Sequence, residues 1–208
     1  MLLLGTAGMF LCIGMRRNRF PIKLWQGAAF TVLLTVVGVA GAMLMFYLES
    51  GSFGGVSFYG SVFLIPMLMP LIGIFFRLKP GQVMDLCGPS VAIMIGCMRF
   101  NCVLNNCCGG WQVCLGSLCF SWPTQAMDSI GDFAIMLWLL QLEREDRAKG
   151  VLYPSFMIAY SMMRFLLEFL RDTPKDWMYL SHGQWFAFAA IVAGLLWIVL
   201  QKRRSSVR

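Results

Sequence analysis

Long apolar runs separated by short polar connectors occupy nearly the whole chain. A helix needs about 20 mostly apolar residues to cross a bilayer, and the runs approach this length once their ends are allowed to vary by a few residues. They predict seven helices, over residues 1–15, 25–48, 58–76, 83–98, 123–142, 151–169 and 184–200. Because the connectors leave no room for a soluble domain, the pattern predicts a single all-α integral membrane domain over residues 1–208, with about seven transmembrane helices.

The composition excludes an ordinary soluble globular protein. Apolar residues make up 59% of the chain and charged residues only 13%, with a mean hydropathy of +0.71. The first apolar run resembles a secretory signal in length, but its basic residues Arg16, Arg17 and Arg19 follow the run and do not precede it. No small-residue cleavage site follows either, so the run is interpreted as a helix.

The basic residues predict an orientation in the membrane. Of the 17 Lys and Arg residues, 13 lie in the connectors 16–23, 77–79 and 144–149 and in the tail 202–208. Since basic connectors stay in the cytoplasm, this distribution predicts an external N-terminus and a cytoplasmic C-terminus. The net charge of +7 is then mostly an orientation signal that also favours anionic lipid. No nucleic-acid partner is expected.

Several ionisable residues lie within or beside the apolar runs, at Asp85, Arg99, Asp128, Asp132, Arg164, Glu168 and Arg171. Such groups are expensive at membrane depth, so they tend to be paired and functional. At about 1.5 Å per residue, Arg99 and Arg164 lie about 24 Å and 20 Å from the inner ends of their helices, in the outer half of the membrane.

Two guanidinium groups at similar depth on different helices favour binding of a phosphate, because their planar forks form bidentate hydrogen bonds. Tyr160, Arg164, Glu168 and Arg171 fall on one stripe of one helix, so Arg164 and Glu168 can pair. The arrangement therefore indicates an anionic lipid headgroup site. In the alternative interpretation Arg164 and Glu168 only neutralise each other, while Arg99 and Arg171 extend to the membrane interface.

Five of the eight cysteines lie in one segment that is predicted to be external, at Cys102, Cys107, Cys108, Cys114 and Cys119. One or two structural disulfides are the favoured interpretation. A dithiol relay is the alternative, since an odd number of cysteines leaves one thiol to react. A metal site is not expected, because the segment lacks paired C-x-x-C ligands. The single histidine, His182, is interpreted as a polar residue at the interface.

An ordered series of short motifs runs along the chain. It consists of Gly54-Gly55-Val56-Ser57-Phe58-Tyr59-Gly60, Arg99 with Asn105 and Gly110, Pro123-Thr124-Gln125, Arg164-x-x-x-Glu168-Phe169-x-Arg171, and Gly183-Gln184. In this order and spacing the series resembles the prolipoprotein diacylglyceryl transferase family, over roughly residues 1–200. The sequence differs from the family pattern at Tyr59, where the family has a histidine, and at Cys102 and Cys107, where it has an asparagine and a glutamate.

The resemblance implies a multi-pass enzyme of the bacterial cytoplasmic (inner) membrane. Such an enzyme transfers diacylglyceryl from phosphatidylglycerol to the lipobox cysteine in the signal peptide of a preprolipoprotein and releases glycerol 1-phosphate. The residues expected to be catalytic are Arg99, Arg164 and Tyr59, and those expected to bind substrate are Asn105, Gly110, Gln125, Glu168, Arg171 and Gln184. No metal or organic cofactor is expected. The competing hypotheses are an external thiol-disulfide oxidoreductase, which would use the cysteine segment, and a non-catalytic lipid-binding membrane paralogue.

Overall fold

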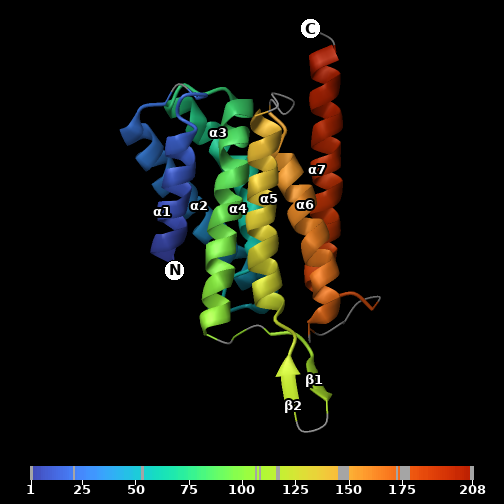
Figure 1. Ribbon diagram of the computed structural model, residues 1–208. Coiled ribbons are helices and arrows are strands. Elements are labelled where there is room, and N and C mark those ends of the chain that lie inside the picture. Colours follow the sequence, from blue (N-terminus) through green and yellow to red (C-terminus); the bar gives the residue numbers. More distant parts are fainter. Residues whose placement is uncertain are drawn as a thin grey trace.

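The computed structural model describes residues 2–20, 22–52, 54–105, 107, 109–115, 118–144, 150–171, 173 and 179–206. Within these ranges the chain forms seven α-helices, one 3-10 turn and one hairpin. The elements are α1 (Leu2–Met15), α2 (Leu24–Ser50), α3 (Phe58–Phe75), α4 (Pro80–Leu104), β1 (Gln112–Leu115), β2 (Leu118–Ser121), α5 (Thr124–Arg144), α6 (Leu152–Leu167), η1 (Glu168–Leu170) and α7 (His182–Ser206). The bundle that they form is shown in Figure 1.

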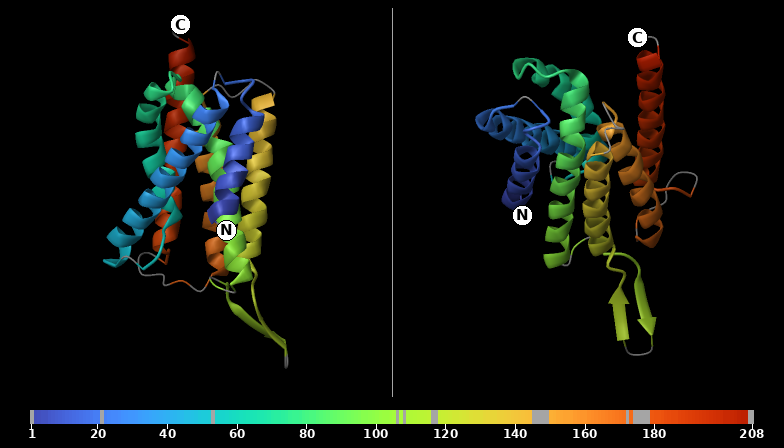
Figure 2. Two further views of the ribbon diagram at one scale, coloured as in Figure 1. Left: turned by 90° about the vertical axis from the view of Figure 1, so that its left-hand side faces the viewer. Right: turned by 45° about the horizontal axis from the view of Figure 1, so that its top comes forward.

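Each predicted apolar run corresponds to one helix, although two details differ from the prediction. Helix α4 continues six residues beyond the predicted end at residue 98, so Arg99 lies inside the helix and not at its end. The cysteine segment contains an antiparallel hairpin in which Gln112 pairs with Ser121 and Leu115 with Leu118. This hairpin extends beyond the helices, at the end of the bundle opposite the C-terminus (Figures 1 and 2). Its strands are four residues each, too short for alternation of polar and apolar residues to reveal them.

Helix α4 is the centre of the bundle. It packs against α1, α3, α5 and α6, while α2 packs against α3 and α7 against α6. The stretch from Val83 to Ala92 is buried without interruption. Because this stretch is buried on every side it has no solvent-facing polar face, which explains why the run shows no amphipathic period.

Glycines allow α2 and α3 to approach each other closely. A Cβ atom at Gly60 would lie 1.9 Å from the carbonyl oxygen of Gly41, so neither backbone tolerates a side chain there. Small residues at such crossings are typical of membrane helices, where close backbone packing drives association. The contact positions the first turn of α3, including Phe58 and Tyr59, which lies toward the hairpin end of the bundle.

Prolines inside two helices leave backbone carbonyls without their helical partners, and side chains from other helices bind these carbonyls. Pro66 has no N–H to donate to Val62, and the Tyr153 hydroxyl donates to the Val62 oxygen instead, at 2.9 Å. Pro89 likewise leaves the Asp85 carbonyl, to which Arg16 Nη2 donates at 2.6 Å. The carbonyls freed by Pro66 and Pro89 thus link α3 and α4 to neighbouring parts of the chain.

A buried polar cluster joins four helices at the end of the bundle where α1 ends and α4 begins. We call Arg16, Asp85 and Glu143 the basic-end cluster. Arg16 Nε pairs with Glu143 at 2.7 Å, and its Nη1 donates to the Leu86 carbonyl at 3.1 Å. The Asp85 carboxylate accepts the backbone N–H groups of Gly150 and Leu152, so a side chain from α4 caps the first turn of α6.

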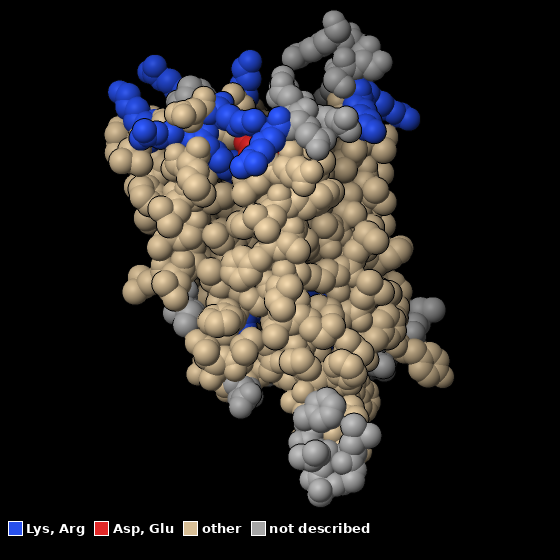
Figure 3. Space-filling model, viewed as in Figure 1, with Lys and Arg blue, Asp and Glu red and all other residues tan. Residues whose placement is uncertain are grey.

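The surface has the character of a membrane protein. In the described ranges, four helices are long and apolar enough to cross a bilayer, Leu24–Ser50, Phe58–Phe75, Pro80–Leu104 and His182–Arg203, and α1 is a shorter apolar helix. Figure 3 shows Lys and Arg side chains gathered at one end, above a broad surface of uncharged residues. The exposed basic residues of this end include Arg17, Arg19, Lys23, Arg77, Lys79 and Arg144. The protein is therefore an all-α membrane protein.

Candidate active site

The predicted arginine on α6 is held by carboxylates from two directions. Arg164 Nη1 donates to both carboxylate oxygens of Asp128, at 3.1 and 2.8 Å, and its Nη2 donates to Glu168 at 3.0 Å. All three side chains are buried. The predicted pair of Arg164 and Glu168 is present, and Asp128 on α5 is a second partner that the sequence reasoning did not assign.

The predicted arginine on α4 reaches the same carboxylate. Arg99 Nε lies 3.5 Å from Asp128 Oδ2, and its guanidinium packs over the ring of Phe58 at 4.7 Å from the centroid. The Arg99 Nε forms no hydrogen bond within the described residues. A guanidinium has five N–H donors, so Arg99 retains donors for an anionic ligand. We call Arg99, Asp128, Arg164 and Glu168 the hairpin-end cluster.

The second oxygen of Glu168 is held from the start of α7. The Ser181 hydroxyl donates to Glu168 Oε1 at 3.1 Å, and the Ser181 backbone N–H donates to Gln184 Oε1 at 2.9 Å. Gln184 N in turn donates to the Ser181 hydroxyl at 3.3 Å, which completes a capping box on α7. Gln184, predicted to bind substrate, therefore positions Ser181 and through it Glu168.

Gly110 ties the base of the hairpin to the end of α6. Its N–H donates to the Trp122 carbonyl, and it forms an isolated bridge with Arg171. A Cβ atom at Gly110 would lie 2.3 Å from the Leu170 carbonyl oxygen, so only glycine fits. Arg171 thus lies where the hairpin and η1 meet. Burial lowers the pKa of its guanidinium, and the positive charges of Arg164 and Arg99 lower it further.

Tyr59 is buried among aromatic rings in the first turn of α3. Its ring centroid is 5.9 Å from that of Tyr160 and 6.0 Å from that of Phe186. Its hydroxyl is buried and forms no hydrogen bond in the described part of the chain. The same is true of the hydroxyls of Tyr160 and Ser161, so several polar atoms next to the hairpin-end cluster are unsatisfied.

The other two predicted polar residues lie at the edge of the site. Asn105 is exposed at the end of α4, where its Nδ2 donates to the Asn101 carbonyl at 2.9 Å. Gln125 is buried and donates to the Cys107 carbonyl at 2.7 Å. Gln125 therefore holds the segment between α4 and the hairpin, while Asn105 contacts only its own helix turn.

The cysteines of the predicted external segment divide between thiol and disulfide. Cys114 is disulfide-bonded, and its backbone pairs with that of Cys119 across the hairpin. Cys107 is an exposed thiol, and Cys102 Sγ donates to the Met98 carbonyl. Cys108 lies outside the described residues, as does the side chain of Cys119. Within the predicted segment, Cys114 is therefore part of a disulfide, whereas Cys102 and Cys107 are thiols.

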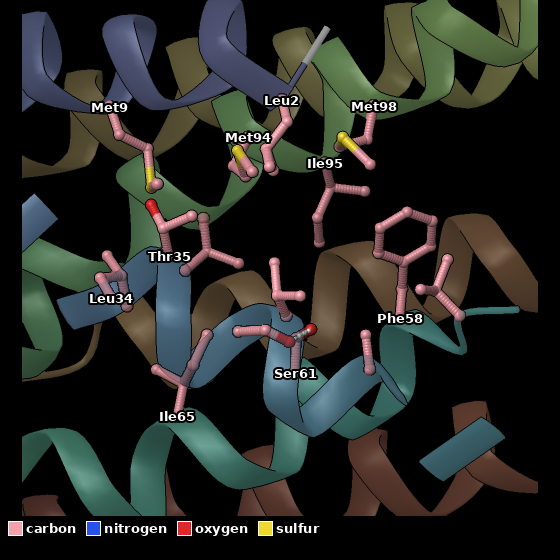
Figure 4. A pocket seen from close by; sticks show the side chains of 15 residues that line it. Leu2, Met9, Leu34, Thr35, Phe58, Ser61, Ile65, Met94, Ile95 and Met98 are labelled. Atoms are coloured by element: carbon pink, nitrogen blue, oxygen red, sulfur yellow. Dashed lines mark hydrogen bonds between the residues drawn. The ribbon is translucent and has the colours of Figure 1, made fainter. Parts of the chain in front are cut away.

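An apolar cavity of about 180 Å³ lies between α1, α2, α3 and α4. Figure 4 shows Met9, Leu34, Ile65 and Ile95 among the side chains that surround it, with Thr35 and Ser61 as the only polar ones. Phe58 forms part of its wall. Because the ring of Phe58 also packs on the Arg99 guanidinium, the cavity adjoins the hairpin-end cluster.

Three residues of the site were not assigned a role from the sequence, namely Asp128, Ser181 and Phe58. Asp128 carried a usable signal, since it is an ionisable residue in an apolar run. Ser181 and Phe58 carried none, because a serine before a helix and a phenylalanine in a membrane span are both common. Only the fold brings these side chains to Glu168 and Arg99.

Comparison with known proteins identifies the family of the chain. The family model described as prolipoprotein diacylglyceryl transferase matches residues 1–200. The phosphatidylglycerol–prolipoprotein diacylglyceryl transferase 2 of Clostridium perfringens (strain 13 / Type A) is 27% identical over 214 residues, covering 90% of this chain and 82% of the relative. The corresponding enzyme of Clostridium tetani (strain Massachusetts / E88) is 31% identical, over 55% of this chain and 51% of the relative. That of Bordetella avium (strain 197N) is 27% identical, over 74% and 63%. Since the family match spans nearly the entire sequence, the chain belongs to the prolipoprotein diacylglyceryl transferase family.

Proposed function

We propose that this protein transfers diacylglyceryl from phosphatidylglycerol to the cysteine thiol of a prolipoprotein. The observation that carries the proposal is the convergence of Arg99 and Arg164, from two different helices, on the single carboxylate of Asp128. Two guanidinium groups that share one carboxylate have donors to spare, and a phosphate is the anion that their geometry fits best. The family membership and the activity after which the relatives are named support the same reaction.

In the proposed reaction the lipid phosphate replaces Asp128 as the partner of Arg99. The 3.5 Å contact between Arg99 and Asp128 is long for a charged pair, so little is lost when it opens. Arg164 stays fixed by two carboxylates and presents its remaining N–H groups in a defined direction. Such preorganised donors stabilise charge as it develops, which is where electrostatic catalysis is most effective.

The bonding changes are a displacement at the terminal carbon of the diacylglyceryl group. The cysteine sulfur forms a bond to this carbon, and the bond from the carbon to the phosphate oxygen breaks. The electron pair of the broken bond stays on that oxygen, and glycerol 1-phosphate leaves. Its additional negative charge develops on the phosphate that Arg99 and Arg164 bind.

The apolar cavity beside Phe58 accommodates an acyl chain of the donor lipid in this proposal. A chain in the cavity would place its ester end near Phe58 and the phosphate near Arg99. Gly38 lines the cavity, and a Cβ atom there would meet no atom closer than 3.9 Å. Gly38→Leu should therefore fill the cavity without displacing α2, and reduce transfer from dipalmitoyl phosphatidylglycerol more than from the dihexanoyl lipid.

We further propose seven membrane spans, with the hairpin outside and the basic end in the cytoplasm of a bacterial cell. The gathering of basic side chains at one end of the bundle supports this orientation. Reporter fusions after residues 50 and 110 should give an external signal, and fusions after residues 20, 78 and 206 an internal one. An internal signal at residue 110 would place both arginines on the wrong side for an external acceptor.

The activity is tested with purified protein, phosphatidylglycerol and a peptide that contains a lipobox cysteine. Release of glycerol 1-phosphate, together with the mass increase of the peptide, is the expected result. Complementation of a bacterial strain depleted of its own diacylglyceryl transferase tests the same activity in cells. Binding of phosphatidylglycerol without release, while a competent family member is active in parallel, would instead establish a non-catalytic lipid-binding protein.

A further inference from the structure

Attack by a cysteine sulfur releases the proton of the thiol, and the reaction needs a group that accepts it. Tyr59, in the first turn of α3, is one ionisable residue of the site. A phenol, with an ordinary pKa near 10, is neutral near pH 7 and its oxygen is too weak a base to keep an additional proton. The Arg99 and Arg164 guanidinium groups are protonated already. The carboxylates of Asp128 and Glu168 are occupied by hydrogen bonds from Arg164.

Asp132 is the buried carboxylate that none of these contacts uses. Its exposed fraction is 0%, and neither of its oxygens forms a hydrogen bond within the described residues. It lies one helical turn along α5 from Asp128, toward the middle of the bundle. Its Cβ atom faces Gly96 of α4, where an added Cβ would lie 3.3 Å away, so the glycine lets α5 bring Asp132 against α4.

Two more unsatisfied hydroxyls, those of Tyr160 and Ser161, lie in the buried region that contains Asp132 and Tyr59. The side chain of Tyr160 interacts electrostatically with Asp132 and packs against the Tyr59 ring at 5.9 Å. Ser161, the next residue on α6, has its hydroxyl beside that of Tyr59. None of these hydroxyls bonds another of them or Asp132 within the described residues, so each keeps a donor and an acceptor for a bridging water molecule or a ligand. A buried polar group without a hydrogen-bond partner destabilises the fold. Four side chains here carry such groups, Tyr59, Asp132, Tyr160 and Ser161, and together they indicate a functional site.

We propose that Asp132 is the proton acceptor of the transfer reaction, and that the hydroxyls of Tyr59, Ser161 and Tyr160, bridged by water molecules, connect it to the acceptor thiol. This inference rests on the proposed function. As the sulfur bonds to the diacylglyceryl carbon, the thiol proton passes to the Tyr59 oxygen while the Tyr59 proton moves on. The last hydroxyl of the chain delivers a proton to the Asp132 carboxylate. The leaving oxygen keeps the electron pair of the broken bond, and Asp132 returns its proton to the phosphate or to water as the product departs.

The charges of the site favour this transfer. Asp132 is surrounded by Asp128 on its own helix, by Arg99 on α4 and by Arg164 on α6. The departing phosphate gains one negative charge beside these arginines during the reaction. Protonation of Asp132 removes one negative charge from the same buried region. The total charge of the buried region therefore stays constant during the reaction. This favours the transfer, because a new uncompensated charge is costly where few water molecules can solvate it.

The test compares Asp132→Asn with Asp132→Glu and with the double variant Tyr59→His/Asp132→Asn. General acid–base catalysis typically contributes about 100-fold or more, so Asp132→Asn should lower kcat for glycerol 1-phosphate release by about that factor. Phosphatidylglycerol binding should not change. Asp132→Glu, which keeps a carboxylate, should retain most activity. Ser129→Ala is the matched control, because Ser129 lies on the same buried face of α5 and bonds only the Gly96 carbonyl.

The double variant separates a proton acceptor from a merely structural residue. A histidine has a pKa near 6.5 and can accept the proton directly, so Tyr59→His should restore at least 10-fold of the activity lost in Asp132→Asn. At low pH the rate of the double variant should then fall as the introduced imidazole becomes protonated. A structural role for Asp132 gives no such rescue, because a histidine at position 59 repairs no packing on α5.

Two outcomes overturn the inference without touching the proposed function. One is wild-type release with Asp132→Asn equally active, and the other is an inactive but folded Asp132→Asn that Tyr59→His does not rescue. If Asp132→Asn fails to fold, Tyr160→Phe carries the test, and full activity of that variant contradicts the hydroxyl chain. Absence of release from the wild type, beside an active family member, overturns the proposed function itself and the proton role with it.

Discussion

The molecule contains two buried clusters of charged residues at opposite ends of its bundle, and their hydrogen bonding differs. In the basic-end cluster Arg16 uses Nε, Nη1 and Nη2, bonding Glu143 and the carbonyls of Leu86 and Asp85. Both oxygens of the Asp85 carboxylate cap α6. One oxygen of Glu143 alone is left without a partner among the described residues.

The hairpin-end cluster has similar residue types and burial but many unused groups. Within the cluster, the Nε atoms of Arg99 and Arg164 have no hydrogen-bond partner in the described ranges. The same holds beside the cluster for both oxygens of Asp132 and for the hydroxyl of Tyr160. Buried charged groups stabilise a fold only when ion pairs and hydrogen bonds among them use all of their donors and acceptors. The comparison therefore supports our proposal that the basic-end cluster holds helices together and the hairpin-end cluster binds the lipid phosphate.

The largest expected effect comes from an arginine of the hairpin-end cluster. Arg164→Lys keeps the positive charge between Asp128 and Glu168, so the protein should remain folded and inserted. A lysine cannot form the same bidentate contacts, and loss of one preorganised donor costs about 100- to 1,000-fold in kcat. Arg99→Lys should behave in the same way in the glycerol 1-phosphate assay. Full transfer by both variants would contradict the phosphate site.

The matching change at the other cluster should affect stability and not chemistry. Arg16→Lys keeps the charge but loses at least one of the bonds to Glu143 and the two carbonyls. Hydrogen bonds to charged groups contribute about 1.5–3 kcal/mol each, so unfolding in detergent should occur at a clearly lower temperature. Activity per folded molecule should stay within about 2-fold of wild type. A large loss of kcat with unchanged stability would erase the distinction between the clusters.

A smaller effect is expected at Tyr59, where the hydroxyl is buried without a partner. Tyr59→Phe removes a link of the proposed proton chain but keeps the ring packing with Tyr160 and Phe186, so transfer should fall about 10-fold at unchanged stability. Tyr59→His should preserve or raise transfer, since imidazole accepts protons near neutral pH. Equal activity of all three proteins in the release assay would make Tyr59 only an aromatic packing residue.

The smallest effect is expected at Gln184, which caps α7 and contacts Glu168 only through Ser181. Gln184→Ala should cost about 1 kcal/mol of stability, as loss of a helix cap usually does. Transfer should fall by a few-fold at most, measured at a temperature where the variant is folded. A loss as large as that of Arg164→Lys would mean that Gln184 binds the substrate directly.

Much of the candidate site was accessible from the sequence because charged residues are rare in apolar runs. Arg99, Arg164 and Glu168 stand out for this reason, and the helical spacing of four predicted the pair that the structure contains. Gln184 and Gly110 were also singled out, but their roles were assigned only by the fold. Gly110 lies against the Leu170 carbonyl and Gln184 caps a helix, and neither contact has a pattern in the sequence.

The sequence by itself determined the class of the protein, its helices and the end where its basic residues gather. These properties depend on local composition, because the length of an apolar run and the charge of its connectors are properties of contiguous residues. Tertiary structure alone decided that Arg99 and Arg164 share Asp128, and that Asp85 caps α6 while Asp132 has no hydrogen-bond partner among the described residues. In sequence these aspartates are alike, each an acid in an apolar run. They differ because partners from distant helices saturate one of them and leave the other unpaired.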